Sequence, residues 1–91
     1  MAMEISFDYA KDRINLDKHG VSLVDAKLLE WSSVMVKPDT RKDYKELREI
    51  GYGLIGERLY CVVFVQRAEV FHIISLRKAN SREVRDYVSE T

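Results

Sequence analysis

The chain has 91 residues, 46% of them hydrophobic, so it is long enough for one compact core and too short for two. Its 15 Lys and Arg residues balance 15 Asp and Glu residues, which excludes bulk charge as an argument for binding nucleic acid or an anionic membrane. No apolar run approaches the ~20 residues that a membrane span needs. We therefore expect a single domain over residues 1–91 that is cytoplasmic and has no membrane contact.

A strand and a helix are predicted at the start of the chain. Residues 4–7 have strand character. Asp8 follows as an N-cap, and the helix that it begins runs to about Lys18. His19 and Gly20 then end this helix, because glycine readily adopts the left-handed conformation that closes many helices.

A second helix is predicted directly after the first. Ser22 is its N-cap, and Asp25 three residues later approximates a capping box. Three apolar side chains share one face of this helix and indicate the side that packs on the core: Val24, Leu28 and Trp31. We expect the helix to end near Trp31.

Four strands are predicted in the middle of the chain, at residues 33–37, 45–54, 59–65 and 70–76. Pro38 ends the first strand, and the charged stretch 39–44 that follows is too polar to be core and is predicted to be a loop. Gly51 and Gly53 interrupt the second strand. The third is continuously apolar, which is typical of a central strand that is covered on both faces.

A terminal helix completes the predicted fold. Asn80 is its N-cap and Glu83 completes a capping box, while Val84, Tyr87 and Val88 form the stripe expected to be buried. The predicted element order is β-α-α-β-β-β-β-α. Because consecutive strands joined by short turns favour an antiparallel sheet with helices packed on it, the predicted fold class is α+β.

Basic residues gather toward the C-terminal end although the chain is neutral. Residues 67–85 hold five basic and two acidic side chains. The basic ones are Arg67, Arg77, Lys78, Arg82 and Arg85. This part of the chain is therefore predicted to present a local basic surface.

Four stretches resemble, in order and spacing, sequences of the BrnT family, toxins of bacterial toxin-antitoxin pairs. They are residues 15–22, 39–51, 58–64 and 73–79, the last followed by Arg82, Glu83 and Tyr87. The resemblance implies a RelE-like fold and a metal-independent ribonuclease that cleaves mRNA, on or off the ribosome, and inhibits translation. It also implies a DNA-binding antitoxin of the BrnA type as the partner, through which the toxin could oligomerise, and no cofactor.

Arginine side chains are the predicted phosphate-binding groups. RNA cleavage without a metal requires a base for the 2′-hydroxyl proton, an acid for the leaving 5′-oxygen, and cations that stabilise the charged phosphorane. The guanidinium stays charged and its donors match two phosphate oxygens, so Arg77, Arg48 and Arg67 are candidates. Arg77 ranks first, because it is predicted at a strand end beside the terminal helix. Lys18, Lys78 and Arg82 are further candidate RNA-binding residues.

The two histidines are the natural candidates for acid-base chemistry near neutral pH. His19 is either a catalytic group beside Lys18 or a helix C-terminal cap. His72 is either catalytic or a partly buried, hydrogen-bonded side chain on the face of Val70 and Ile74. Sequences resembling BrnT usually have arginine at position 72, and glycine is common where this chain has Lys45.

Carboxylates and a tyrosine complete the candidate catalytic set. Glu83 acts either as a base or in the helix cap, and Glu46 either as a base or as the partner of a basic side chain. Tyr87 either contacts RNA or packs in the core. Cys61, the only cysteine, is interpreted as a buried apolar residue, and with two histidines a structural zinc site is not expected.

Three possibilities remain open on the sequence. The first is a ribonuclease toxin. The second is a binding module, attenuated in catalysis by His72, that acts as an antitoxin partner or corepressor. The third is a small structural protein whose motifs match by chance.

Overall fold

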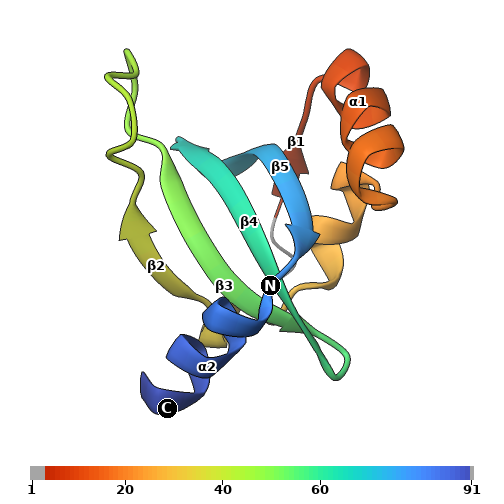
Figure 1. Cartoon of the computed structure of the whole chain (residues 1–91). Helices are drawn as coiled ribbons and strands as arrows, with labels where there is room; N and C mark the ends of the chain where they lie inside the picture. The colour runs from red at the N-terminus through yellow and green to blue at the C-terminus, as the bar shows by residue number, and fades with distance from the viewer. Residues whose placement is uncertain (1–3, 91) are drawn as a thin grey trace.

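The computed structural model describes residues 4–90. Its elements are β1 (Glu4–Ser6), α1 (Tyr9–His19), the 3₁₀ helices η1 (Leu23–Leu28) and η2 (Trp31–Ser33), β2 (Met35–Pro38), β3 (Glu49–Ile55), β4 (Arg58–Arg67), β5 (Val70–Lys78) and α2 (Ser81–Glu90). The five strands form one curved sheet. α1 and the 3₁₀ helices lie at one side of this sheet, and α2 lies at its far end (Figure 1). Within residues 4–90, no helix is long and apolar enough to cross a membrane.

The sheet confirms the α+β class but is mixed rather than antiparallel. Its strand order is β1-β5-β4-β3-β2, which places the apolar β4 at the centre, as predicted. The pairs β2/β3, β3/β4 and β4/β5 are antiparallel, whereas β1 runs parallel to β5. The antiparallel prediction is wrong at this edge, because β1 is joined to the rest of the sheet through helices and no hairpin turn fixes its direction.

The first helix begins and ends as its caps predict. The Asp8 carboxylate accepts hydrogen bonds from the backbone N–H groups of Ala10 and Lys11. Gly20 has a φ of 72° and its N–H binds the Leu16 carbonyl. The capping role belongs to Gly20, so the His19 side chain is left to face the sheet.

The second predicted helix is replaced by η1 and η2. Ser22 caps η1 as expected. The chain then extends at Leu29, and the Glu30 N–H binds the Leu54 carbonyl of β3 instead of a helical carbonyl. Trp31 is thereby placed edge-on against Phe64, with ring centroids 5.2 Å apart. The helical spacing that predicted one α-helix is overridden by this tertiary packing.

Gly51 and Gly53 lie inside an unbroken strand, contrary to the predicted interruption. A Cβ atom at Gly51 would come within 2.7 Å of the Val34 side chain, and one at Gly53 within 2.6 Å. The two glycines therefore allow the segment after η2 to pack closely on β3.

One face of the sheet carries the main core and is called here the covered face. Its residues are Gly51, Val62, Phe64, Ile73 and Leu76, packed against Val21, Leu23, Ala26 and Leu29. Asn15 of α1 joins this core by hydrogen bonds to the Leu76 N–H and carbonyl, at 3.2 and 2.7 Å, and to the Val21 carbonyl. The amide thus pairs with the edge of β5 beyond the end of β1.

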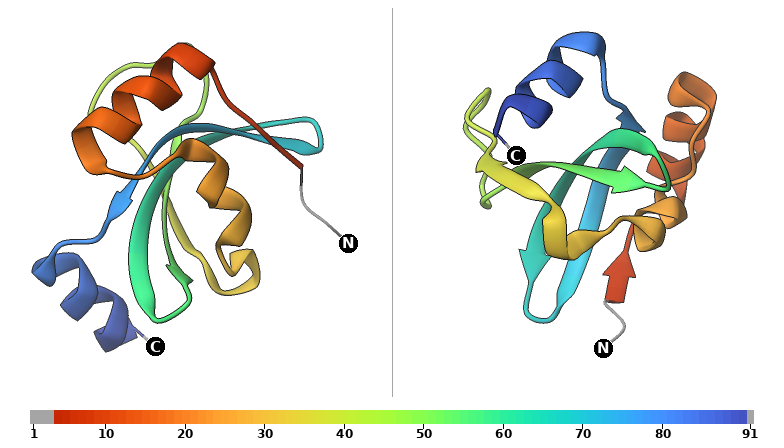
Figure 2. Two further views of the ribbon diagram at one scale, coloured as in Figure 1. Left: turned by 90° about the vertical axis from the view of Figure 1, so that its right-hand side faces the viewer. Right: turned by 90° about the horizontal axis from the view of Figure 1, so that it is seen from below.

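α2 lies beyond the end of β5 and does not bury the predicted stripe (Figure 2). Val84 is 39% exposed and Val88 63% exposed, while Tyr87 is half-buried. The predicted capping box is present, with Asn80 and Glu83 exchanging side-chain to backbone hydrogen bonds. The stripe prediction is wrong because the helix is attached to the sheet through polar contacts at its first turn.

Candidate active site

A register shift in β5 determines which side chains reach the opposite face of the sheet. Val63 pairs with Ser75 and Phe64 pairs with Ile73, so Ile74 is an extra residue without a partner on β4. This bulge returns Leu76 to the covered face and directs Ser75 and Arg77 to the other side, called here the open face. The open face carries Arg48, Ile50, Tyr52, Cys61, Val63, Val65, His72, Ser75 and Arg77.

Arg77 and Glu83 form a two-point ion pair at one end of the open face. The Arg77 Nη1 and Nη2 atoms donate to the two Glu83 carboxylate oxygens at 2.8 and 2.9 Å. Hydrogen bonds from Arg77, opposed by burial, lower the Glu83 pKa to about 2 and leave it a weak base. Glu83 therefore both caps α2 and holds that helix to the sheet.

A hollow of about 360 Å³ opens in front of this ion pair. Three cationic side chains line it, Lys37, Arg41 and Arg77, together with the carboxylates of Asp39 and Glu83. The remaining lining residues are Pro38, Thr40, Ile50, Tyr52, Cys61, Val63 and Ser75. The hollow therefore combines an excess of one positive charge with hydroxyl donors, which suits a polar anionic ligand.

Arg41 is held in the hollow by a buried carboxylate that the sequence did not reveal. The Asp39 side chain is fully buried although it starts the predicted charged loop. Its oxygens accept from the Arg41 Nε and Nη2 atoms, both at 2.8 Å. These hydrogen bonds hold the Asp39 pKa well below its usual range, against the opposing effect of burial. A polar stretch thus contributes one anchored residue, for which the sequence gives no signal.

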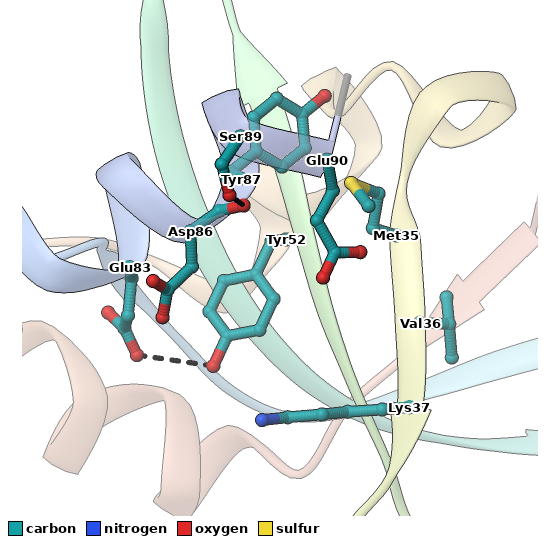
Figure 3. Close-up of a pocket in the computed structure, with 9 residues that line it drawn as sticks. All are labelled: Met35, Val36, Lys37, Tyr52, Glu83, Asp86, Tyr87, Ser89 and Glu90. Atoms are coloured by element: carbon teal, nitrogen blue, oxygen red, sulfur yellow. Dashed lines mark hydrogen bonds between the residues drawn. The ribbon is translucent and has the colours of Figure 1, made fainter.

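Tyr52 is a second residue that the sequence analysis missed. Its hydroxyl donates to Glu83 at 3.2 Å, and burial is the main cause that raises its pKa to about 12. Figure 3 shows Glu83, Asp86 and Glu90 of α2 around Tyr52, with Lys37 beside its ring, in a neighbouring hollow of about 310 Å³. Strand alternation in the sequence places Tyr52 on the same face as Ile50. It does not predict that this face meets α2 at Glu83.

His19 and Lys18 line a third hollow that adjoins the first. Both side chains come from the end of α1, and Ser75 borders the two hollows. Burial, with the charges of Lys18 and Arg77, lowers the His19 pKa, so its imidazole is neutral near pH 7. Two sequence candidates therefore lie near Arg77 from an element far away in the chain.

Four other candidates gather at the opposite end of the open face. Arg67 donates to both Glu46 oxygens, at 2.9 and 3.3 Å, which confirms Glu46 as the partner of a basic side chain. His72 is hydrogen-bonded to the Ser6 hydroxyl through Nδ1 at 2.8 Å, and burial lowers its pKa. Arg48 stacks on Tyr44 at 4.1 Å. This end is separate from the Arg77 end.

The last three candidates lie outside the central hollow. Tyr87 lines the hollow of Figure 3, and its hydroxyl donates to the Ser33 carbonyl at 3.4 Å. Lys78 follows Arg77 on the strand, so its side chain points to the other side of the sheet. Arg82 is exposed on α2.

Cys61 is buried beneath the hollow, as expected, and burial raises the pKa of its thiol. Within residues 4–90 no group of three His, Cys, Asp or Glu side chains is placed to hold a metal ion.

Comparison with known families gives one match. A family model described as the ribonuclease toxin BrnT of type II toxin-antitoxin systems matches residues 7–83. No curated protein matches the chain. The matched range includes Arg41, Tyr52, Arg77 and Glu83, and it ends in the first turn of α2.

Proposed function

This chain belongs to the BrnT family of ribonuclease toxins of type II toxin-antitoxin systems, and from that premise we propose that it cleaves RNA in the hollow beside Arg77. The observation that carries this location is the Arg77 fork, which faces a hollow on the open face that is lined by three cationic side chains and two carboxylates. We further propose a RelE-like fold and cleavage without a metal ion.

Arg77 can bind a phosphate without losing Glu83. A guanidinium has five N–H donors, and Arg77 uses three of them, two to Glu83 and one to the Lys78 carbonyl. The Nε–H and one Nη2 hydrogen remain for a phosphate oxygen. Because the charge of Arg77 is fixed, it stabilises the negative charge that grows on the phosphorane.

His19 is assigned as the general base for the 2′-hydroxyl. Its imidazole is neutral near pH 7 and it lines the hollow that meets the Arg77 hollow at Ser75. Glu83 is less suited, because its low pKa reflects tight binding to Arg77. In this route the 2′-oxygen bonds to phosphorus as His19 takes its proton, the bond from phosphorus to the 5′-oxygen breaks, and the leaving 5′-oxygen takes a proton from solvent water. The products are a 2′,3′-cyclic phosphate and a 5′-hydroxyl.

The cellular role follows from the family premise. We propose that the substrate is mRNA in the cytoplasm, that its cleavage inhibits translation, and that a DNA-binding antitoxin of the BrnA type neutralises the toxin. The excess of cations around the Arg77 hollow supports an RNA substrate despite the neutral chain.

A catalytically attenuated binding module is the second candidate. It is favoured by the full ion pairing of Arg77 and by His72, whose lowered pKa leaves it uncharged near pH 7. Such a protein would bind its antitoxin without cleaving RNA.

Direct assay of the purified chain on labelled single-stranded RNA separates the two functions. We expect cleavage in the presence of a chelator, and growth arrest with transcript loss when the chain is expressed without antitoxin. Intact RNA in both experiments, from soluble folded protein, would favour the binding module.

The variant His72→Arg tests attenuation. Higher cleavage than the parent chain is expected if position 72 limits activity, because arginine restores a fixed charge beside Arg67 and Glu46. Equal cleavage by the two proteins rejects attenuation by His72.

A further inference from the structure

Arg48 differs from the other arginines near the open face. Arg41, Arg67 and Arg77 each form a two-point ion pair, with Asp39, Glu46 and Glu83 respectively. Within residues 4–90, no carboxylate lies within ion-pair distance of Arg48. Its charge is therefore not matched by a bound acceptor.

The Arg48 guanidinium is held by stacking instead. Its central carbon lies 4.1 Å from the centroid of the Tyr44 ring, and its Nε atom is buried with no hydrogen-bond acceptor. Because the Nε atom is buried, an anion would reach the guanidinium at its terminal Nη groups, where Arg48 lines a hollow. Stacking fixes the plane of the guanidinium and leaves its edge available to an anion.

The Arg48 end is connected to the Arg77 end by adjoining hollows. A hollow of about 480 Å³ lined by the 39–48 loop includes Arg48 and shares Asp39 and Thr40 with the hollow at Arg77. Arg48 is four residues from Tyr52 along the chain, and Tyr52 is aligned with Cys61 of β4 and through it with Arg77 of β5. Arg48 and Arg77 are therefore two inter-strand spacings apart, with β4 between them. Strand geometry then gives a separation of about 16 Å between the two backbone positions. The Arg77 guanidinium is held at Glu83 and the Arg48 guanidinium at the Tyr44 ring, so we expect them to contact different phosphates of one strand.

We propose that Arg48, stacked on Tyr44, binds a phosphate of single-stranded RNA at least two nucleotides away from the phosphate cleaved at Arg77. This subsite rests on the proposed ribonuclease function and adds a requirement on substrate length. Arg48 can bind the RNA without first breaking an ion pair. The RNA then extends along the 39–48 loop toward Arg77.

The test compares two non-cleavable 2′-O-methyl RNAs, a dinucleotide and an octanucleotide, in binding to the parent chain and to Arg48→Gln. Glutamine removes the charge and keeps a polar side chain, although a shorter one. We expect octanucleotide affinity to fall about tenfold, as for loss of one charged hydrogen-bonded contact, and dinucleotide affinity to stay unchanged. The slope of log affinity against log salt should fall by about 0.7 for the octanucleotide.

Arg58→Ala is the matched control, because Arg58 is an exposed arginine at the start of β4. Tyr44→Phe should retain octanucleotide binding and Tyr44→Ala should weaken it, which separates stacking from the hydroxyl. An unchanged octanucleotide affinity in a folded Arg48→Gln protein overturns the subsite, as does an equal loss for both RNAs.

The subsite and the ribonuclease proposal fail in different ways. If no RNA is cleaved by the parent chain but Arg48→Gln still weakens only the octanucleotide, the subsite stands and the nuclease function falls. If RNA is cleaved and Arg48→Gln leaves the KM for long RNA unchanged, the subsite falls and the nuclease function stands.

Discussion

The two faces of the sheet are built by alternating residues of the same strands, yet they carry different kinds of side chain. On the covered face Phe64, Ile73 and Leu76 are at most 1% exposed and belong to a cluster of apolar side chains. On the open face the arginines are partly exposed and most are ion-paired. Burial of apolar area contributes far more folding free energy than exposed ion pairs. Stability and ligand binding are therefore expected to separate by face.

Phe64→Ala should have the largest effect on stability. The ring is almost completely buried between Trp31 and Phe71, so its loss leaves a cavity and lowers the free energy of unfolding by about 3–5 kcal/mol. Urea denaturation measures the change. Val36→Ala, at a 46% exposed position, is the control and should change stability by less than about 0.5 kcal/mol. Equal effects of the two variants would contradict the claim that burial of the Phe64 ring stabilises the fold.

Asn15→Ala should have the next largest effect. The variant leaves the Leu76 N–H and carbonyl without their side-chain partners in the core, which costs about 1–3 kcal/mol. Leu16→Ala, at a 45% exposed position of the same helix, serves as the control in the same denaturation series. A loss no greater than that of the control contradicts the role given to the amide.

Acid should weaken the protein through the open face. The Glu83 pKa is lowered to about 2 from an ordinary value of 4.5. The ionised carboxylate therefore stabilises the folded protein fully above pH 4.5, and this contribution is lost as the pH falls toward 2. The loss should be about 1–2 kcal/mol, allowing for solvent screening at Arg77. Glu83→Gln should flatten the dependence of unfolding free energy on pH between 5 and 2. An unchanged curve would show that the ion pair does not stabilise the fold.

Arg13→Ala should have the smallest effect. Arg13 and Asp17 are 4.0 Å apart, and their side chains are 81% and 74% exposed. An exposed pair of this kind contributes less than about 0.5 kcal/mol. A larger fall in the urea midpoint than for Asn15→Ala would reverse the order expected from burial.

Local signals in the sequence predicted the elements whose causes are local. The caps at Asp8, Gly20 and Asn80 are formed as expected, and the apolar run of β4 is the central strand. The second helix and the buried stripe of α2 were wrong, because the first depends on the packing of Trp31 and the second on where α2 lies.

The site could be predicted only in part for a similar reason. Arg77 and Glu83 are six residues apart and were both candidates. Their meeting with Arg41 and Tyr52 depends on strand register and on a bulge at Ile74, neither of which the sequence pattern reveals. Asp39 was missed because its burial requires Arg41, and a charged stretch is ordinarily exposed.

The most direct test of the division between the faces is RNA cleavage by Arg77→Ala, with the unfolding free energy measured on the same preparation. Arg58→Ala is the control. We predict that Arg77→Ala loses cleavage by at least about a hundredfold while remaining folded, as expected for removal of a charge-stabilising group. Cleavage by folded Arg77→Ala at the rate of the Arg58→Ala control would contradict the placement of the site on the open face.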